Sequence, residues 1–260
     1  MTAQAPPIAS GEKVLTLIEH LRELRHRVMI SVIAVVLGVL VSIWPLTKYV
    51  FHQLVRPAEQ QVPGFKLHQF QLLDYWSTYF RVSLMLGVAI AMPVIIYQVL
   101  AFIAPGLTRT ERRWLYSFIG GGSAMFLLGM AFAYFVALPR MLDFLLKPGT
   151  ADVQPTISVT AYVDTVTRII LMSGLVFETP LFIMALAKVG VVTSRRLLKV
   201  WRYAVVLSVI VASFMAPSWN PLTPIIVGIP IFGLYALGVV LARLVEGGAM
   251  LRHPPPGDSS

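Results

Sequence analysis

The chain has 260 residues, of which 57% are hydrophobic and only 13% are charged. A water-soluble protein carries roughly 25% charged residues, so this composition excludes a soluble globular class and indicates a surface that mostly contacts lipid. The absence of cysteine excludes disulfides, iron–sulfur clusters, thiolate zinc sites and cysteine nucleophiles. The stretches between apolar segments are too short to form a core of their own, and we expect one integral membrane domain over residues 1–252.

The N-terminal segment, residues 1–27, carries acidic residues among its basic ones and shows no signal-peptide cleavage pattern. Insertion is therefore expected to begin at the first membrane span. Apolar residues recur at spacings of three and four between residues 14 and 24, which predicts an amphipathic helix at the membrane interface. At the other end, the proline-rich residues 253–260 are predicted to be a disordered tail.

Six apolar segments are predicted to span the membrane, because a spanning helix needs about 20 mostly apolar residues. They cover residues 28–48, 80–103, 114–138, 165–188, 203–216 and 222–241. The last two come from one long uncharged run that the prolines and asparagine of residues 216–221 divide into a hairpin. The fifth segment reaches only about 21 Å, which is short of a hydrocarbon core of roughly 30 Å. Either the bilayer thins there or the hairpin stops part-way across.

The basic residues predict the orientation of these spans. With the N-terminus in the cytoplasm, 14 lysines and arginines fall in inside segments and 7 in outside ones, so both termini are expected to be cytoplasmic. Arg81 and Arg168 begin their spans from the outer side, and we expect them to extend to the lipid headgroups. The net charge of +9 is spread over short loops rather than along a basic stripe, which argues against nucleic-acid binding.

Glu178 is the most unusual residue of the sequence. It lies in the middle of an apolar run, two residues before Pro180. A carboxylate at such a position costs a few kcal/mol on insertion scales, so these residues usually face a protein interior or cavity and mark a functional site. One role open to such an acid is a proton relay.

Two other carboxylates, Glu23 and Glu111, each lie among basic residues in predicted cytoplasmic segments. One interpretation is a set of surface ion pairs, which are common and weak. The other is a pair of carboxylates held for an incoming guanidinium, whose planar fork matches a carboxylate with two parallel hydrogen bonds.

Catalytic motifs are lacking, so no enzyme, cofactor or metal site is expected. The histidines show no paired metal-ligand spacing within a span, and there is no nucleophile elbow or phosphate-binding glycine loop. The alternative function is a proton-coupled secondary transporter that uses Glu178. That class predicts an inverted repeat with a broken helix in each half, and the sequence shows one intramembrane acid without a matching segment.

Six segments together carry a resemblance to a known family: HLRELRHR (20–27), PVIIYQ (93–98), AFIAPGL (101–107), ERR (111–113), GMAFAYF (129–135) and FETP (177–180). In this order and at these relative positions they resemble the signature segments of TatC, the polytopic receptor subunit of the twin-arginine protein translocase. The resemblance covers nearly the whole chain. It implies an all-α, six-helix, glove-shaped bundle with short fifth and sixth helices, in the bacterial cytoplasmic (inner) membrane.

The resemblance also implies a function. Such a subunit binds the twin-arginine signal peptides of folded cargo at its cytoplasmic face. It scaffolds the single-span subunits TatA and TatB, in several copies per complex, for export driven by the proton-motive force. The implied peptide-binding residues are Glu23, Glu111, Phe102, Gln98 and Arg25. The implied intramembrane site that meets TatA and TatB comprises Glu178, Tyr134 and Pro57.

From the residues alone, several of these have simpler explanations. Phe102 is also explained by ordinary packing, Tyr134 by an interfacial aromatic cluster and Pro57 by a tolerated helix bend. The chain departs from the family pattern before the sixth span, where Asn220 stands in place of an acid and Pro224 follows in place of a glutamine. Asn220 can cap a helix but cannot supply a carboxylate, so a charged role there is in doubt.

Overall fold

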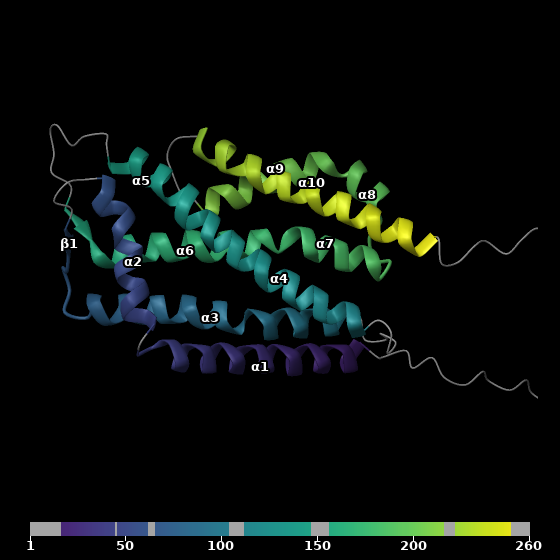
Figure 1. Cartoon of the computed structure of the whole chain (residues 1–260), viewed down its shortest axis with the longest axis horizontal. Coiled ribbons are helices and arrows are strands. Elements are labelled where there is room, and N and C mark those ends of the chain that lie inside the picture. Colours follow the sequence, from purple (N-terminus) through teal and green to yellow (C-terminus); the bar gives the residue numbers. More distant parts are fainter. Residues whose placement is uncertain are drawn as a thin grey trace, which may run out of the picture.

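The structure is a computed structural model that describes residues 17–44, 46–61, 66–103, 112–146, 156–215 and 222–250. Glu111, Asn220 and the predicted tail 253–260 lie outside the described residues. Most of the long helices run roughly along one common axis (Figure 1). We call the end at which α1 (Leu17–Ser42) begins and α10 (Leu222–Met250) ends the inner end. The end that carries α2 (Leu46–Gln61) and β1 (Leu67–His68) is called the outer end, after the predicted orientation.

Long apolar helices make up most of the bundle. In chain order the elements are α1 (Leu17–Ser42), α2 (Leu46–Gln61), β1 (Leu67–His68), α3 (Asp74–Ile103), α4 (Arg112–Phe132), η1 (Ala133–Ala137), α5 (Leu138–Leu146), β2 (Ile157–Ser158), α6 (Val159–Phe177), α7 (Thr179–Lys188), α8 (Ser194–Lys199), α9 (Trp201–Met215) and α10 (Leu222–Met250). The π-helical turn η1 joins α4 to α5, and α6 passes into α7 at Glu178.

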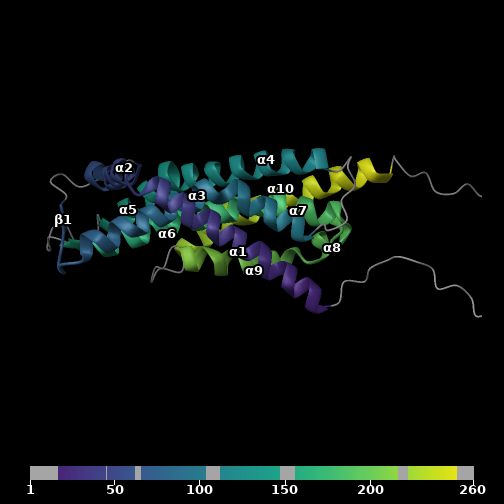
Figure 2. The same cartoon turned by 90° about the horizontal axis from the view of Figure 1, so that it is seen from below.

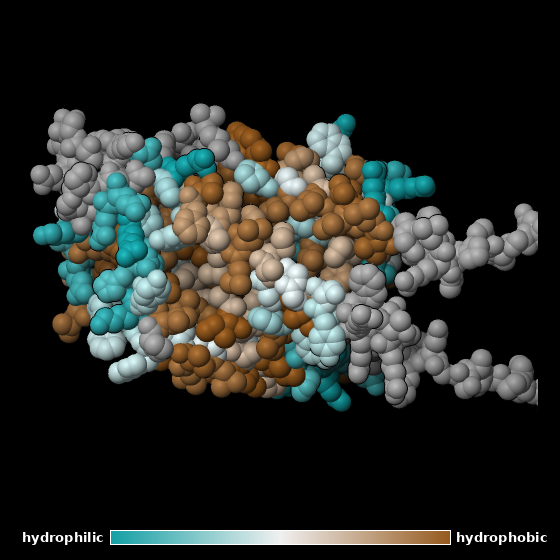
Figure 3. Space-filling model, viewed as in Figure 1, coloured by the Kyte–Doolittle hydropathy of each residue, from teal (hydrophilic) through white to brown (hydrophobic). Residues whose placement is uncertain are grey.

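Five segments of the described chain are long and apolar enough to cross a membrane, and α9 is a shorter apolar helix of 15 residues. On the face that Figure 3 shows, apolar surface covers the middle of the molecule, while hydrophilic residues gather at the two ends. This pattern is expected for a bundle whose middle contacts hydrocarbon and whose ends contact headgroups and water.

Close approach of α1 to α3 depends on two glycines. A Cβ added to Gly38 would lie 2.6 Å from the carbonyl oxygen of Gly87, so the two backbones touch at this crossing. Small residues permit such contacts between membrane helices. Towards the outer end, Ser42 Oγ donates to the Ser83 carbonyl at 3.2 Å, and the hydroxyls of Thr47 and Ser83 lie 2.9 Å apart. These buried hydrogen bonds fix the turn from α1 into α2 against α3.

The helix α4 crosses α6 and α7 diagonally (Figure 1), lying towards one face of the bundle while α9 lies towards the other (Figure 2). The crossing again uses glycines. A Cβ at Gly129 would meet the Ser173 carbonyl oxygen at 2.7 Å, and one at Gly174 would meet the ring of Phe126 at 2.7 Å. Phe126 is fully buried at this point, so a large aromatic ring fills the space that the glycine leaves.

The outer end is closed by α2 and by the parallel pair of β1 and β2, in which Leu67 pairs with Ile157. Pro57 lies inside α2 and is buried. Because proline has no N–H, the carbonyl of Gln53, four residues earlier, has no helical partner. Tyr134 fills this role, since its hydroxyl donates to the Gln53 carbonyl at 2.8 Å. The proline in α2 and the tyrosine in η1 thus form one structural unit.

Three features differ from the sequence expectations. The residues expected to form a separate interfacial helix are, from Leu17 onward, part of α1, because no proline or glycine interrupts the chain before Gly38. The helix α10 has 29 residues and is longer than the expected short sixth helix, although its apolar span Val227–Glu246 has 20. The amphipathic helix α2 was not expected, since it is too polar to register as a span.

Candidate functional site

A polar cluster links α1 and α3 at the inner end, and we call it the inner polar cluster: His20, Glu23, Arg27, Gln98 and Phe102. Both Nε and Nη2 of Arg27 donate to Glu23 Oε1, at 3.0 and 2.5 Å. The Arg27 Nη1 donates to Gln98 Oε1 at 3.4 Å, so the guanidinium connects the two helices. The Glu23 and Arg27 side chains are 24% and 21% exposed, and water can reach both of them.

An aromatic stack lies beside this ion pair. The rings of His20 and Phe102 are 4.3 Å apart and nearly parallel, at 15°. The His20 Nδ1 lies 3.7 Å from the second carboxylate oxygen of Glu23, Oε2. Glu23 is therefore flanked by an arginine on one oxygen and a histidine near the other, and it is partly screened by an aromatic pair.

The structure brings three of the five implied peptide-binding residues together: Glu23, Gln98 and Phe102. Arg25 is exposed and lies two positions from both Glu23 and Arg27, which places it on the opposite side of α1. Glu111 lies outside the described residues. His20 and Arg27 were not singled out from the sequence. Their spacings of three and four residues from Glu23 nevertheless indicate side chains that can interact on one face of a helix.

Glu178 lies at the break between α6 and α7. Its N–H donates to the Leu175 carbonyl at 3.2 Å and its carbonyl accepts from Phe182 N at 2.9 Å, so the chain stays helical on both sides. The carboxylate faces α4, because a Cβ at Gly122 would lie 3.1 Å from Oε2. The other oxygen, Oε1, is buried and has no hydrogen-bond partner among the described residues.

Tyr134 and Pro57 do not join Glu178 in one site. Gly122, which touches Glu178, precedes Tyr134 by twelve residues along α4 and η1, which corresponds to about 18 Å. The tyrosine hydroxyl is engaged with the Gln53 carbonyl beside Pro57. The three residues therefore form two separate features, a buried carboxylate in the middle of the bundle and a hydrogen-bonded cap at its outer end.

The sequence predicts only that Arg81 and Arg168 extend to the lipid headgroups. In the structure they also form ion pairs. Both bind Asp164: Arg81 Nη1 pairs with Oδ1, and Arg168 Nη2 donates to Oδ2 at 2.8 Å. We call these three residues the outer charge triad. Asp164 was not singled out from the sequence, and its pairing with Arg81 spans 83 residues of chain, so no local spacing could have indicated it.

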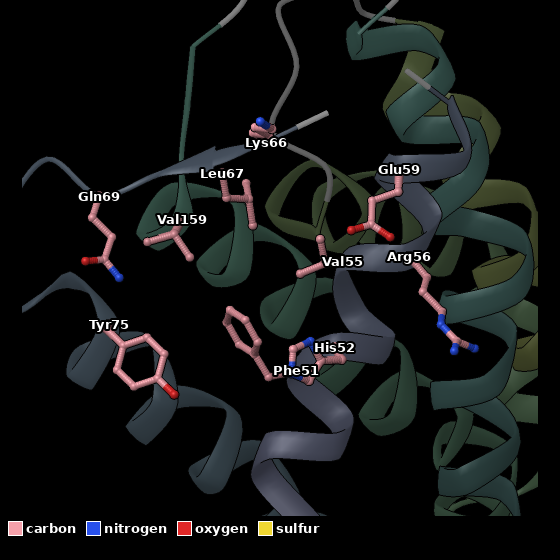
Figure 4. A pocket seen from close by; sticks show the side chains of 10 residues that line it. All are labelled: Phe51, His52, Val55, Arg56, Glu59, Lys66, Leu67, Gln69, Tyr75 and Val159. Atoms are coloured by element: carbon pink, nitrogen blue, oxygen red, sulfur yellow. The ribbon is translucent and has the colours of Figure 1, made fainter. Parts of the chain in front are cut away.

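The outer end also contains an open cavity of about 710 Å³ between α2, the segment around β1, and the starts of α3 and α6 (Figure 4). Its lining is mixed in character: Phe51, His52, Val55, Arg56, Glu59, Lys66, Leu67, Gln69, Tyr75 and Val159. Two basic groups and one acid point to no single ligand. No group of three or more histidine, aspartate or glutamate side chains able to hold a metal is found in the described part of the chain.

These features define a class of protein, a multi-pass all-α membrane protein with polar sites at the inner end and in the middle of the bundle. A model of the family described as "Sec-independent protein translocase protein (TatC)" matches residues 19–230. The chain belongs to this TatC family, whose members are transport subunits and not enzymes.

Individual relatives agree with this assignment. The Aquifex aeolicus "Sec-independent protein translocase protein TatC" is 34% identical over 232 residues, covering 88% of this chain and 95% of that protein. The chloroplastic TATC of Arabidopsis thaliana is 34% identical over 233 residues, covering 90% of this chain and 68% of the longer plant protein. A crystal structure titled "Twin Arginine Translocase Receptor- TatC" matches with a TM-score of 0.77 at 33% identity, over 88% of this chain and all of the other. The likeness confirms the predicted polytopic helical fold.

Proposed function

We propose that this chain is the signal-peptide receptor of a twin-arginine translocase in a bacterial inner membrane. In this proposal both termini lie in the cytoplasm, and the inner polar cluster binds the paired arginines of the signal peptide of a folded cargo protein. The chain also scaffolds TatA and TatB, in several copies per complex, for export driven by the proton-motive force. Family membership and the charged inner end support the proposal.

The observation that carries it is that Glu23 already holds a guanidinium. Two nitrogens of Arg27 donate to one carboxylate oxygen, at 3.0 and 2.5 Å. A carboxylate that accepts the arginine fork in this way has the position and exposure to accept one from a peptide. The incoming arginine either displaces Arg27 or binds Oε2, which lies 3.7 Å from His20 Nδ1.

Neighbouring groups favour arginine over lysine. The side-chain amide oxygen of Gln98, Oε1, accepts from Arg27 and offers a second acceptor beside the carboxylate. A planar guanidinium can meet both acceptors at once, whereas an ammonium is a compact point charge. Phe102 supplies an aromatic face next to the site, on which a guanidinium can stack once His20 moves. In this proposal Glu111 supplies the second carboxylate, for the second arginine.

Glu178 is proposed to contact the transmembrane helix of TatA or TatB. Its Oε1 is buried without a partner in the described structure, which is unfavourable for a polar atom. A donor from another chain would satisfy this oxygen if its binding displaced the groups that cover it. Polar contacts between membrane helices contribute about 0.6–2 kcal/mol, enough to set register in an assembly that must come apart.

The test is binding of a signal peptide with Arg-Arg, and of the same peptide with Lys-Lys, to the purified chain and its variants. Glu23→Gln and Glu111→Ala are each expected to weaken Arg-Arg binding about tenfold, since a hydrogen bond to a charged group contributes about 1.5 kcal/mol. Glu59→Gln, at the exposed outer end, is the matched control and should bind normally. Equal affinity for the two peptides, or unchanged affinity of Glu23→Gln, would contradict the proposal.

A further inference from the structure

The outer charge triad is unusually exposed for charged groups on membrane helices. The side chains of Arg81, Asp164 and Arg168 are 41%, 37% and 48% exposed. Two guanidinium groups share one carboxylate, so the triad carries a net charge of +1. Ionisable groups on spanning helices usually face a protein interior, a water-filled cavity or a headgroup. These three side chains lie on the surface of the bundle, so their net positive charge is available to an anionic group.

Contacts along α3 give the depth of the triad. The Tyr79 hydroxyl donates to the Ile43 carbonyl at 2.5 Å, and Ser42 Oγ donates to the Ser83 carbonyl. Arg81 lies between these two contacts in the chain, and it is therefore level with the last residues of α1. The first candidate span ends at Ser42, so in the predicted orientation we expect the triad at the outer boundary of the hydrocarbon region. Phosphate groups of the outer leaflet are found at this depth.

The arginines retain donors for such a group. A guanidinium has five N–H donors. In the described residues each of the two arginines makes one hydrogen bond, to Asp164. Asp164 also holds the two planar groups close together, one from α3 and one from α6. A phosphodiester carries one negative charge and two free oxygens. It can therefore balance the net charge of the triad and accept hydrogen bonds from both guanidinium groups.

An apolar stripe runs from the triad towards the middle of the membrane. Leu84 lies one turn inward from Arg81 on α3, and Met172 and Leu175 lie one and two turns inward from Arg168 on α6. These side chains are 42%, 39% and 49% exposed. A lipid whose phosphate binds the arginines can lay an acyl chain along this stripe.

We propose that Arg81 and Arg168, oriented by Asp164, form a binding site for the phosphodiester of an outer-leaflet phospholipid, whose acyl chain lies along Leu84, Met172 and Leu175. The depth, the net positive charge and the adjoining apolar stripe together favour a lipid over a soluble anion. The site is separate from the inner polar cluster and does not depend on signal-peptide binding.

The first test measures thermal unfolding of the full chain in an uncharged detergent, with phosphatidylglycerol added. The phospholipid should raise the unfolding midpoint, whereas a diacylglycerol with the same acyl chains and inorganic phosphate should not. Arg81→Gln and Arg168→Gln should each lose at least half of this shift. Lys48→Gln, an exposed cation of α2 at the same end, should retain it. A shift that survives in both arginine variants, or that the phosphate-free lipid or inorganic phosphate reproduces, overturns the proposal.

Asp164→Asn separates a lipid site from a simple clasp between α3 and α6. The variant loses both ion pairs, and with them the orientation of the guanidinium groups, but it keeps both arginines. The baseline midpoint should therefore fall, and the shift with phosphatidylglycerol should be reduced but not abolished. Complete loss of the lipid shift would contradict binding by the arginines, and an undiminished shift would contradict their orientation by Asp164. In membranes, a photo-crosslinking residue in place of Leu84 should form adducts mainly with phospholipid. Adducts mainly with a protein would show that another helix occupies this surface and would likewise overturn the proposal.

Discussion

Tyr134→Phe should destabilise the protein because it removes the hydrogen bond to a carbonyl group of another helix, α2. In α2, Pro57 cannot donate to Gln53, and the Tyr134 hydroxyl donates to that carbonyl instead, at 2.8 Å. Phenylalanine keeps the ring and removes only the donor. The carbonyl of Gln53 is then left without a partner at the partly buried outer end.

The size of the effect follows from this geometry. An unsatisfied buried polar group costs about 1–3 kcal/mol, and partial exposure of this site to water places the expected loss near the lower end, at about 1 kcal/mol. In a Pro57→Ala background, residue 57 regains an N–H that can bond to Gln53 within the helix. There, Tyr134→Phe should cost less than about 0.5 kcal/mol. The two substitutions are thus coupled, although their residues lie on different helices.

A double-mutant cycle measures this coupling from the free energy of unfolding of the wild type, the two single variants and the double variant. Tyr162→Phe is the control. The Tyr162 hydroxyl donates at 2.8 Å to the carbonyl of Leu54, whose helical donor Ala58 is not a proline. Its loss should therefore cost the same with or without Pro57. An equal cost of Tyr134→Phe in both backgrounds would refute the reasoning.

Three further predictions concern other parts of the bundle. Gly38→Ala places a methyl group 2.6 Å from a carbonyl oxygen of α3 and should lower the free energy of unfolding by about 1–3 kcal/mol. The control is Gly120→Ala, whose methyl group meets no atom within 4 Å. This substitution should leave the free energy of unfolding unchanged or raise it by up to about 1 kcal/mol. Equal effects would contradict the packing at the crossing. Arg27→Gln should raise the affinity for an Arg-Arg peptide severalfold in a binding titration, since it vacates Glu23; weaker binding would instead show that Arg27 positions the carboxylate. Glu178→Gln should leave peptide binding unchanged and alter co-purification of TatA or TatB; loss of peptide binding alone would contradict the division between the two sites.

The spanning helices were predictable because hydrocarbon imposes a simple rule on sequence. Every backbone polar group must be satisfied within the membrane, and a long uncharged run therefore forms a helix. The short fifth helix followed from the same reasoning, and α9 has 15 residues. The helix α2 was missed because it is amphipathic and lies at the outer end, where this rule does not apply. The pairing of β1 with β2 joins segments 90 residues apart and leaves no local pattern.

The candidate sites were predictable to different degrees. Glu178 stands out in any hydropathy profile, and the resemblance to TatC indicated Glu23, Gln98 and Phe102, which the structure places together. The partner of Glu23 was within reach, since Arg27 follows at the i+4 spacing that favours ion pairs on a helix. Pairings between helices are set by the tertiary fold. For this reason neither the sharing of Asp164 by two arginines nor the bond from Tyr134 to α2 could be inferred from sequence alone.

The close backbone contact of α1 with α3 at Gly38 lies far from the inner polar cluster on the same helix. Gly38 touches the α3 backbone, and Glu23 lies fifteen residues away, at about 22 Å along the helix axis. At that lever length, a tilt of about 5° around the crossing moves Glu23 by about 2 Å, enough to break its link through Arg27 to Gln98. The inner polar cluster is therefore sensitive to small tilts of α1 around a crossing that lies four residues from the outer end of this helix.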